Sequence, residues 1–176
     1  TIEFSEDSQM ASIGQYSFFG SSIERVKIPK LVTTIGDYSF SECDKLITVE
    51  FSQNSDLISI CPFAFYKSSI QSISIPKQVQ QIEAYTFYEC HQLKTVEFDK
   101  NADLLSIGEY SFFENSIEKV EIPRNVKEIG NFAFYGCIHL KSVEIPQNCD
   151  LCSIGVFTFC KSGIEKVVIP SFVDKI

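Results

Sequence analysis

The stretch IEKVEIPRNVKEIGNFAFYGCIHLKSVEIP, from Ile117 to Pro146, contains every kind of segment that the rest of the chain repeats. It has a short alternating run that ends in proline, an Ile-Gly pair, an aromatic-small-Phe triplet and a cysteine, after which the alternating run returns. The repeated segment starts at Ile13, Ile35, Ile60, Ile82, Ile107, Ile129 and Ile154. The intervals alternate between 22 and 25 residues, so one short and one long unit make a period of 47 residues. A fixed period of this length predicts a repeat architecture.

Each unit contains a run with the alternation of a half-buried strand. In LITVEF, Val49 and Phe51 point one way while Thr48 and Glu50 point the other, because side chains alternate across a strand. Equivalent runs in seven units predict short strands that stack into a parallel ladder. The intervening segment, GDYSFSEC in one unit, has room for about one or two helical turns. We therefore expect short helices or 3-10 turns there.

No single unit can bury its own apolar face, so the core must consist of equivalent residues stacked along the array. We expect two aromatic ladders. The first, which we name the Phe spine, contains Phe18, Phe40, Phe65, Phe87, Phe112, Phe134 and Phe159. The second contains Tyr16, Tyr38, Phe63, Tyr85, Tyr110, Phe132 and Phe157.

The combined pattern L-x-x-V-x-I-P-x-x-V-x-x-I-G-x-x-[AS]-F-x-x-C-x-x-L resembles the BspA-type leucine-rich repeat of bacterial and protist surface proteins, and the resemblance covers essentially the whole chain. It implies an α/β repeat solenoid, a right-handed superhelix with a parallel ladder of short strands on one face and short helical or 3-10 turns on the other. Residues 1–176 would form a single solenoid of seven units, with a partial unit at the N-terminus and no capping units. Cys61 and Glu83 replace the usual glycine, which indicates that a positive φ is not compulsory at that position.

The resemblance also implies a non-enzymatic function, namely binding or adhesion at a cell surface or in secreted form, with a protein or glycan as partner. Two alternatives stay open: a rigid spacer that holds other domains apart, and an intracellular protein-interaction scaffold. Ordinary repeat fragments, TIEFSEDSQM and IPSFVDKI, stand at the two ends, so we expect fraying there or end-to-end self-association through uncapped termini.

The charge balance argues against nucleic acid as a partner. Acidic residues outnumber basic ones by 23 to 15, giving a formal net charge of -8, and no cluster of lysine and arginine reverses that balance locally. No apolar run approaches the roughly 18 residues that cross a bilayer. We therefore expect no membrane insertion by this segment, which also shows neither an anchor nor an export signal.

The cysteines do not form a metal or disulfide framework in this interpretation. Cys43, Cys90 and Cys137 lie two units apart, so their Cα atoms should be about 9 to 10 Å from each other. That distance is too long for a disulfide and for a shared zinc ion. We predict three inert, buried thiols. Cys149 and Cys152 form a C-x-x-C, but no second pair completes a zinc site, and the equivalent residues of other units are ordinary loop and core positions.

No constellation of catalytic residues is recognisable, and we expect no enzymatic activity, cofactor or metal. His91 and His139 occupy non-equivalent positions, without a matching nucleophile and carboxylate. An Asn-x-Asp sequence recurs at Asn54, Asn101 and Asn148, which is compatible with a calcium ladder. Asn and Asp also close turns by bonding their own backbone, and we favour that interpretation because the Gly-rich calcium-binding nonapeptide is absent.

The outward side chains of the expected strands form two adjacent rows, which are the candidate ligand-facing residues. The first row is Arg25, Thr48, Ser72, Thr95, Lys119, Ser142 and Lys166, and the second row is Lys27, Glu50, Ser74, Glu97, Glu121, Glu144 and Val168. A solvated face without function is one interpretation of these rows. The other is a face that binds a basic or hydroxyl-rich partner, with Glu97, Glu121 and Glu144 as acceptors and the Thr/Ser row for hydrogen bonds.

Overall fold

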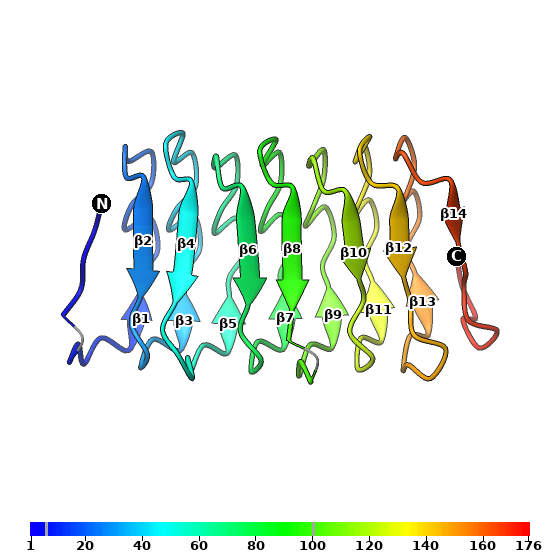
Figure 1. The fold of residues 1–176 in the computed structure, drawn as a ribbon, viewed down its shortest axis with the longest axis horizontal. Helices are drawn as coiled ribbons and strands as arrows, with labels where there is room; N and C mark the ends of the chain where they lie inside the picture. Colours follow the sequence, from blue (N-terminus) through cyan, green and yellow to red (C-terminus); the bar gives the residue numbers. More distant parts are fainter. Residues whose placement is uncertain (6, 100) are drawn as a thin grey trace.

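The chain folds into a solenoid whose turns stack along one long axis (Figure 1), as the computed structural model shows for residues 1–5, 7–99 and 101–176. The turns contribute strands to two parallel sheets, and the two ends of the chain lie at opposite ends of the stack. Apolar side chains from both sheets and from the connecting turns fill the interior as one continuous core. The fold is therefore a parallel β-solenoid.

Sheet A contains the longer strands, which are β2 (Arg25–Ile28), β4 (Thr48–Phe51), β6 (Ser72–Ile75), β8 (Thr95–Phe98), β10 (Lys119–Glu121), β12 (Ser142–Glu144) and β14 (Lys166–Val167). They pair in parallel in the order of the chain's turns, from β2 at one edge to β14 at the other. Exposed and buried residues alternate along them. The strand ladder that the sequence predicts is confirmed.

Sheet B was not predicted. Its two-residue strands are β1 (Ser12–Ile13), β3 (Thr34–Ile35), β5 (Ser59–Ile60), β7 (Gln81–Ile82), β9 (Ser106–Ile107), β11 (Glu128–Ile129) and β13 (Ser153–Ile154). Each strand ends on the isoleucine that marks the repeat, and these isoleucines are buried and paired in register, as Ile35 is with Ile60. The repeated isoleucine is thus both a core residue and a member of sheet B.

The prediction of short helices or 3-10 turns is wrong, because no α-helix or 3-10 helix occurs in the described part of the chain. In the second turn, Tyr38 and Glu42 have φ angles of 53° and 57°, in the left-handed region that interrupts a right-handed helix. The same two positions have positive φ in each turn; they are Tyr16, Tyr38, Phe63, Tyr85, Tyr110, Phe132 and Phe157, and then Gly20, Glu42, Lys67, Glu89, Glu114, Gly136 and Lys161.

Hydrogen bonds between turns compensate for this backbone conformation. The backbone N–H of Phe40 donates to the carbonyl of Ala64 at 2.8 Å, and the N–H of Glu42 donates to the carbonyl of Tyr66 at 2.7 Å. The N–H of the residue between them, Ser41, donates within its own turn to the carbonyl of Tyr38 at 3.2 Å. Hydrogen bonds to the next turn thus alternate with hydrogen bonds within the turn. Since backbone polar groups inside a protein must be paired, these bonds replace the ones that a helix would make.

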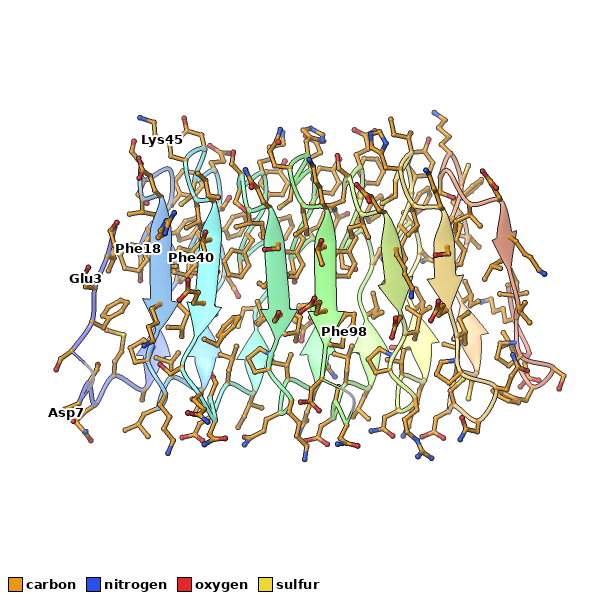
Figure 2. The ribbon with its side chains drawn as sticks, viewed as in Figure 1. Glu3, Asp7, Phe18, Phe40, Lys45 and Phe98 are labelled. Atoms are coloured by element: carbon orange, nitrogen blue, oxygen red, sulfur yellow. The ribbon has the colours of Figure 1, made fainter. Side chains whose placement is uncertain are left out.

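The Phe spine is confirmed. Its five central rings are fully buried, and its stacked neighbours have nearly parallel planes, with ring centroids 5.4 Å apart for Phe65 and Phe87 and 5.2 Å apart for Phe87 and Phe112. The first two rings, Phe18 and Phe40, are labelled in Figure 2. The second aromatic ladder is also present and lies closer to the surface. In it, the ring centroids of Tyr38 and Phe63 are 4.6 Å apart.

The three regularly spaced cysteines are buried and their thiols are free. Each Sγ donates to the carbonyl oxygen of a spine phenylalanine 25 residues earlier, at 3.1 Å for Cys43, 3.0 Å for Cys90 and 3.1 Å for Cys137. The thiol therefore fills the corner and also donates to a spine carbonyl, which in two of the three turns already accepts a backbone N–H, from Ser21 at Phe18 and from Ser68 at Phe65.

We predict that Cys90 and Cys137 resist a thiol reagent in the folded protein, whereas the exposed Cys152 reacts. Burial raises the pKa of the Cys90 and Cys137 thiols to about 12, so near pH 8 only about one in 10,000 of each would be the reactive thiolate, and these side chains are also shielded from solvent. A titration with Ellman's reagent should show Cys152 reacting before denaturant is added and the buried pair only afterwards. Rapid reaction of the buried pair without denaturant would contradict the prediction.

Candidate functional site

The candidate site is the exposed face of sheet A, seen from the front in Figure 2. Backbone pairing aligns the whole first row, because each member from Arg25 to Lys166 is the register partner of the next. Thr48 and Ser142 are half-buried and the other five members are exposed. The structure thus brings the first row together as one line across the sheet.

The second row is divided into pairs. Lys27 is in register with Glu50, Ser74 with Glu97, and Glu121 with Glu144. Strands β4 and β6 pair only at Thr48 and Ser72, and β8 and β10 only at Thr95 and Lys119, so the register between the pairs is not continued. The second row is therefore a series of two-residue steps, and its last member, Val168, lies just beyond the end of β14.

Two contacts moderate the negative charge of the second row. Lys119 Nζ lies 2.8 Å from Glu121 Oε1 and 2.8 Å from Glu144 Oε1, and these two hydrogen bonds raise the pKa of the Lys119 ammonium. Ser74 Oγ donates to Glu97 Oε2 at 2.9 Å. Like charges directly opposed in a ladder repel, and a lysine between Glu121 and Glu144 relieves that repulsion. Glu97 has no ion pair among the described residues.

The strands separate in pairs because the loops that follow them differ in length. Eight residues lie between Phe51 and Ile60 in a long unit, but only six lie between Ile75 and Ile82 in the next short unit. The longer loops must therefore extend further from the stack than the shorter loops beside them. Figure 1 shows the grouping, with β6 nearer to β8 than to β4.

This alternation leaves three depressions at the end of the strand face, which we name the notches. The central notch has a volume of about 470 Å³ and runs from Phe51 across Pro76 to Phe98. The next has a volume of about 510 Å³ and runs from Phe98 across Pro123 to Pro146. The third, of about 230 Å³, contains Pro29 between Phe4 and Ser52. Each notch has the proline of a short unit at its centre and residues of long units at its sides.

Comparison with known proteins agrees with this architecture. The family described as BspA type Leucine rich repeat region matches residues 1–63 and 58–176, in six copies. The chain belongs to the BspA-type leucine-rich repeat family. No curated protein matches the chain.

Solved structures of bacterial proteins have a similar fold. A leucine-rich repeat protein from Bacteroides ovatus is 26% identical, with a TM-score of 0.68 over 93% of this chain and 48% of that one. The pneumococcal vaccine antigen PcpA is 18% identical, with a TM-score of 0.58 over 85% of this chain and 51% of that one. A leucine rich cell surface protein from Faecalibacterium prausnitzii is 23% identical, with a TM-score of 0.56 over 80% of this chain and 43% of that one. This BspA-type chain spans about half the length of these proteins.

The other sequence candidates occupy separate places on this BspA-type solenoid. His91 and His139 are exposed, and the His91 ring nitrogen Nδ1 lies 2.9 Å from the carbonyl oxygen of Glu114. Within residues 1–5, 7–99 and 101–176, no three His, Cys, Asp or Glu side chains meet in a group suited to a metal ion. Asn54, from the repeated Asn-x-Asp, has a φ of 55°, which is typical of a turn. In the same ranges no helix has the length and apolar character to span a membrane.

Sequence reasoning missed two features of this BspA-type surface. The notches were missed because the 22/25 alternation was interpreted only as a period; the signal was the two extra residues after each long-unit strand. The other feature is a third aromatic ladder of stacked rings, formed by Tyr66, Tyr88, Phe113 and Tyr135. Ser41 and Cys160 occupy the equivalent positions in the units before and after these four rings, so the repeat is harder to recognise in the sequence.

Proposed function

We propose that this chain is a non-enzymatic protein-interaction module that recognises a protein partner at a cell surface through the exposed face of sheet A. The observation that carries the proposal is the first row, seven polar side chains that backbone pairing holds in one line. Because the backbone fixes their spacing, a partner can bind several of them without the cost of ordering a flexible loop. Membership of the BspA-type family, and the cell-surface description of the Faecalibacterium prausnitzii protein, support this proposal.

The chemistry of the face favours a partner with basic or hydroxyl-bearing groups. Glu97 is available as an acceptor, since it takes one hydrogen bond from Ser74 and has no ion pair among the described residues. Glu121 and Glu144 share Lys119, and a partner cation can replace that lysine at either carboxylate. Complementary charge of this kind contributes chiefly to the association rate and to partner choice. The Thr and Ser members of the first row would add hydrogen bonds that fix the orientation of the partner.

We predict that the triple variant Glu97→Gln, Glu121→Gln, Glu144→Gln loses the salt-sensitive part of partner binding while its fold is unchanged. All three side chains are exposed, so the substitutions remove charge without altering the core. The test is to pan a random-peptide display library against the wild-type protein, and to measure the selected peptides against both proteins at low and high salt. The melting temperature of the variant serves as the control for folding.

The expected result is enrichment of Lys- and Arg-containing peptides that bind the triple variant more weakly and with less dependence on salt. Two outcomes would overturn the proposal. One is unchanged binding to the triple variant, with binding lost instead when loop residues such as Asp56 and Asp103 are replaced by asparagine. The other is the absence of any selected peptide, which would favour a rigid spacer over a recognition module.

A further inference from the structure

We propose that the three notches bind a polyproline II segment of the partner, with one apolar residue of that segment in each notch and its basic residues over the acidic groups beside them. This inference rests on the proposed function and names the chemical class of partner for the same face. It also gives a role to the alternation of 22- and 25-residue units, which the strand ladder alone does not require.

The walls of the notches have the chemistry of known polyproline sites. Phe98, labelled in Figure 2, is the last residue of β8, is half-buried, and lines both larger notches. Phe51 lines the opposite side of the central notch, and Pro76 lies between the two rings. Polyproline II helices dock into grooves that aromatic side chains line, because the ligand is already extended and loses little entropy on binding.

The spacing of the notches fits the period of this ligand. Equivalent residues two units apart along a parallel ladder are about 9.6 Å apart, which is twice the strand spacing of about 4.8 Å. A polyproline II helix has three residues per turn and a rise of about 3.1 Å per residue, so every third side chain recurs after about 9.3 Å. A ligand parallel to the solenoid axis can therefore place residues i, i+3 and i+6 in three successive notches.

The charges beside the two larger notches favour a basic ligand. Glu97 and Asp99 line the central notch, and Asp99 lines the next notch as well, together with Glu121 and Glu144. Each of these notches has one cationic lining residue among those described, Lys77 in the first case and Arg124 in the second. Among the described lining residues, acidic groups thus outnumber basic ones at both notches. Arginine or lysine side chains on the side of the ligand that faces these carboxylates would complement them.

Among the described residues, the lining of the smallest notch has the opposite charge. Its lining includes Lys27 and Lys30 and no carboxylate among the described residues. A ligand that spans all three notches should therefore have its basic residues toward Pro123 and a neutral or acidic end toward Pro29.

The test uses three synthetic twelve-residue peptides and the whole chain. The probe PPRPPRPPRPPR has arginine at every third position, RPPPRPPPRRPP has the same composition without that period, and PPEPPEPPEPPE keeps the period with opposite charge. We expect the first to bind about tenfold more tightly than the second in isothermal titration calorimetry, and the third to show no binding. Equal affinity for the first two would overturn the match of periods.

Variants at the notch wall locate the site. Phe98→Ile introduces the residue that the third long unit has at the equivalent position, Ile145. The fold should therefore be retained, while the aromatic ring is removed from both notches. We expect Phe98→Ile to weaken binding of PPRPPRPPRPPR about tenfold, Asp99→Asn to weaken it about fivefold, and Glu109→Gln, an exposed change at the aromatic corner, to leave it unchanged. Asp99→Asn alters only a surface group, so it tests the same notches if Phe98→Ile fails to fold.

Failure of this inference and failure of the proposed function give different results. Library peptides that depend on Glu97, Glu121 and Glu144 but bind Phe98→Ile and the wild-type protein equally would overturn the notch proposal and leave the proposed function intact. Binding of oligosaccharides on a glycan array that Phe98→Ile abolishes, without binding of PPRPPRPPRPPR, would likewise overturn the polyproline assignment. Binding of PPRPPRPPRPPR that requires both the glutamates and Phe98 supports the two together.

Discussion

Replacing Phe87 by alanine is expected to lower the free energy of unfolding by about 3–5 kcal/mol. The ring is fully buried at the centre of the Phe spine and stacks on Phe65 and Phe112, with centroids 5.4 and 5.2 Å away. Its removal loses the transfer free energy of the side chain and leaves a cavity between turns. The two stacking contacts add about 0.5–1.5 kcal/mol each beyond burial. Urea denaturation followed by far-UV circular dichroism measures the change.

The matched control is Phe18→Ala, the same position in the first turn. Phe18 is half-buried and has only one spine neighbour, Phe40, at 5.1 Å. We expect this substitution to cost less than half as much as Phe87→Ala, because fewer contacts are lost and less apolar surface returns to water. Equal losses at the two positions would show that the spine contributes little and that stability comes mainly from the two strand ladders.

The parts of the fold that the sequence predicts are those with a long, regular pattern. Sheet A could be predicted because each strand alternates apolar and polar residues, as in Val49 and Glu50. The Phe spine could be predicted because its ring recurs in all seven units. Sheet B could not, because a strand of two residues such as Thr34–Ile35 is too short to show alternation.

The turns were mispredicted for a different reason. Segments such as GDYSFSEC contain no proline and only one glycine, so local propensity gives no signal against a short helix. The left-handed conformation of Tyr38 is unfavourable for an isolated aromatic residue, and it is stabilised here by stacking on Tyr16 and Phe63 and by hydrogen bonds to the next turn. Contacts between turns therefore override the preference of each turn alone.

The candidate site shows the same limit of local reasoning. The sequence correctly places Glu121 beside Glu144, but it does not reveal that Lys119 contacts both carboxylates, because Lys119 lies on the same strand as Glu121 and could equally extend into water. The notches depend on the difference between consecutive loops, which no single repeat contains. Features that depend on differences between neighbouring units therefore cannot be predicted from the consensus sequence of the units.

Replacing Gly130 by alanine is expected to destabilise the protein by roughly 1–3 kcal/mol, because the new methyl group has no space. A Cβ there would lie 2.6 Å from the Glu109 backbone nitrogen and 2.8 Å from the Gly108 carbonyl carbon, so the neighbouring turn must move. Gly14→Ala is the matched control, since its nearest contact is the flexible Ser17 Oγ at 3.2 Å. Urea denaturation of both variants should show a loss for Gly130→Ala and little change for Gly14→Ala. Equal small effects would show that the spacing of the turns adapts to a side chain at this position. Such tolerance would also explain why another unit has Glu83 at the equivalent position.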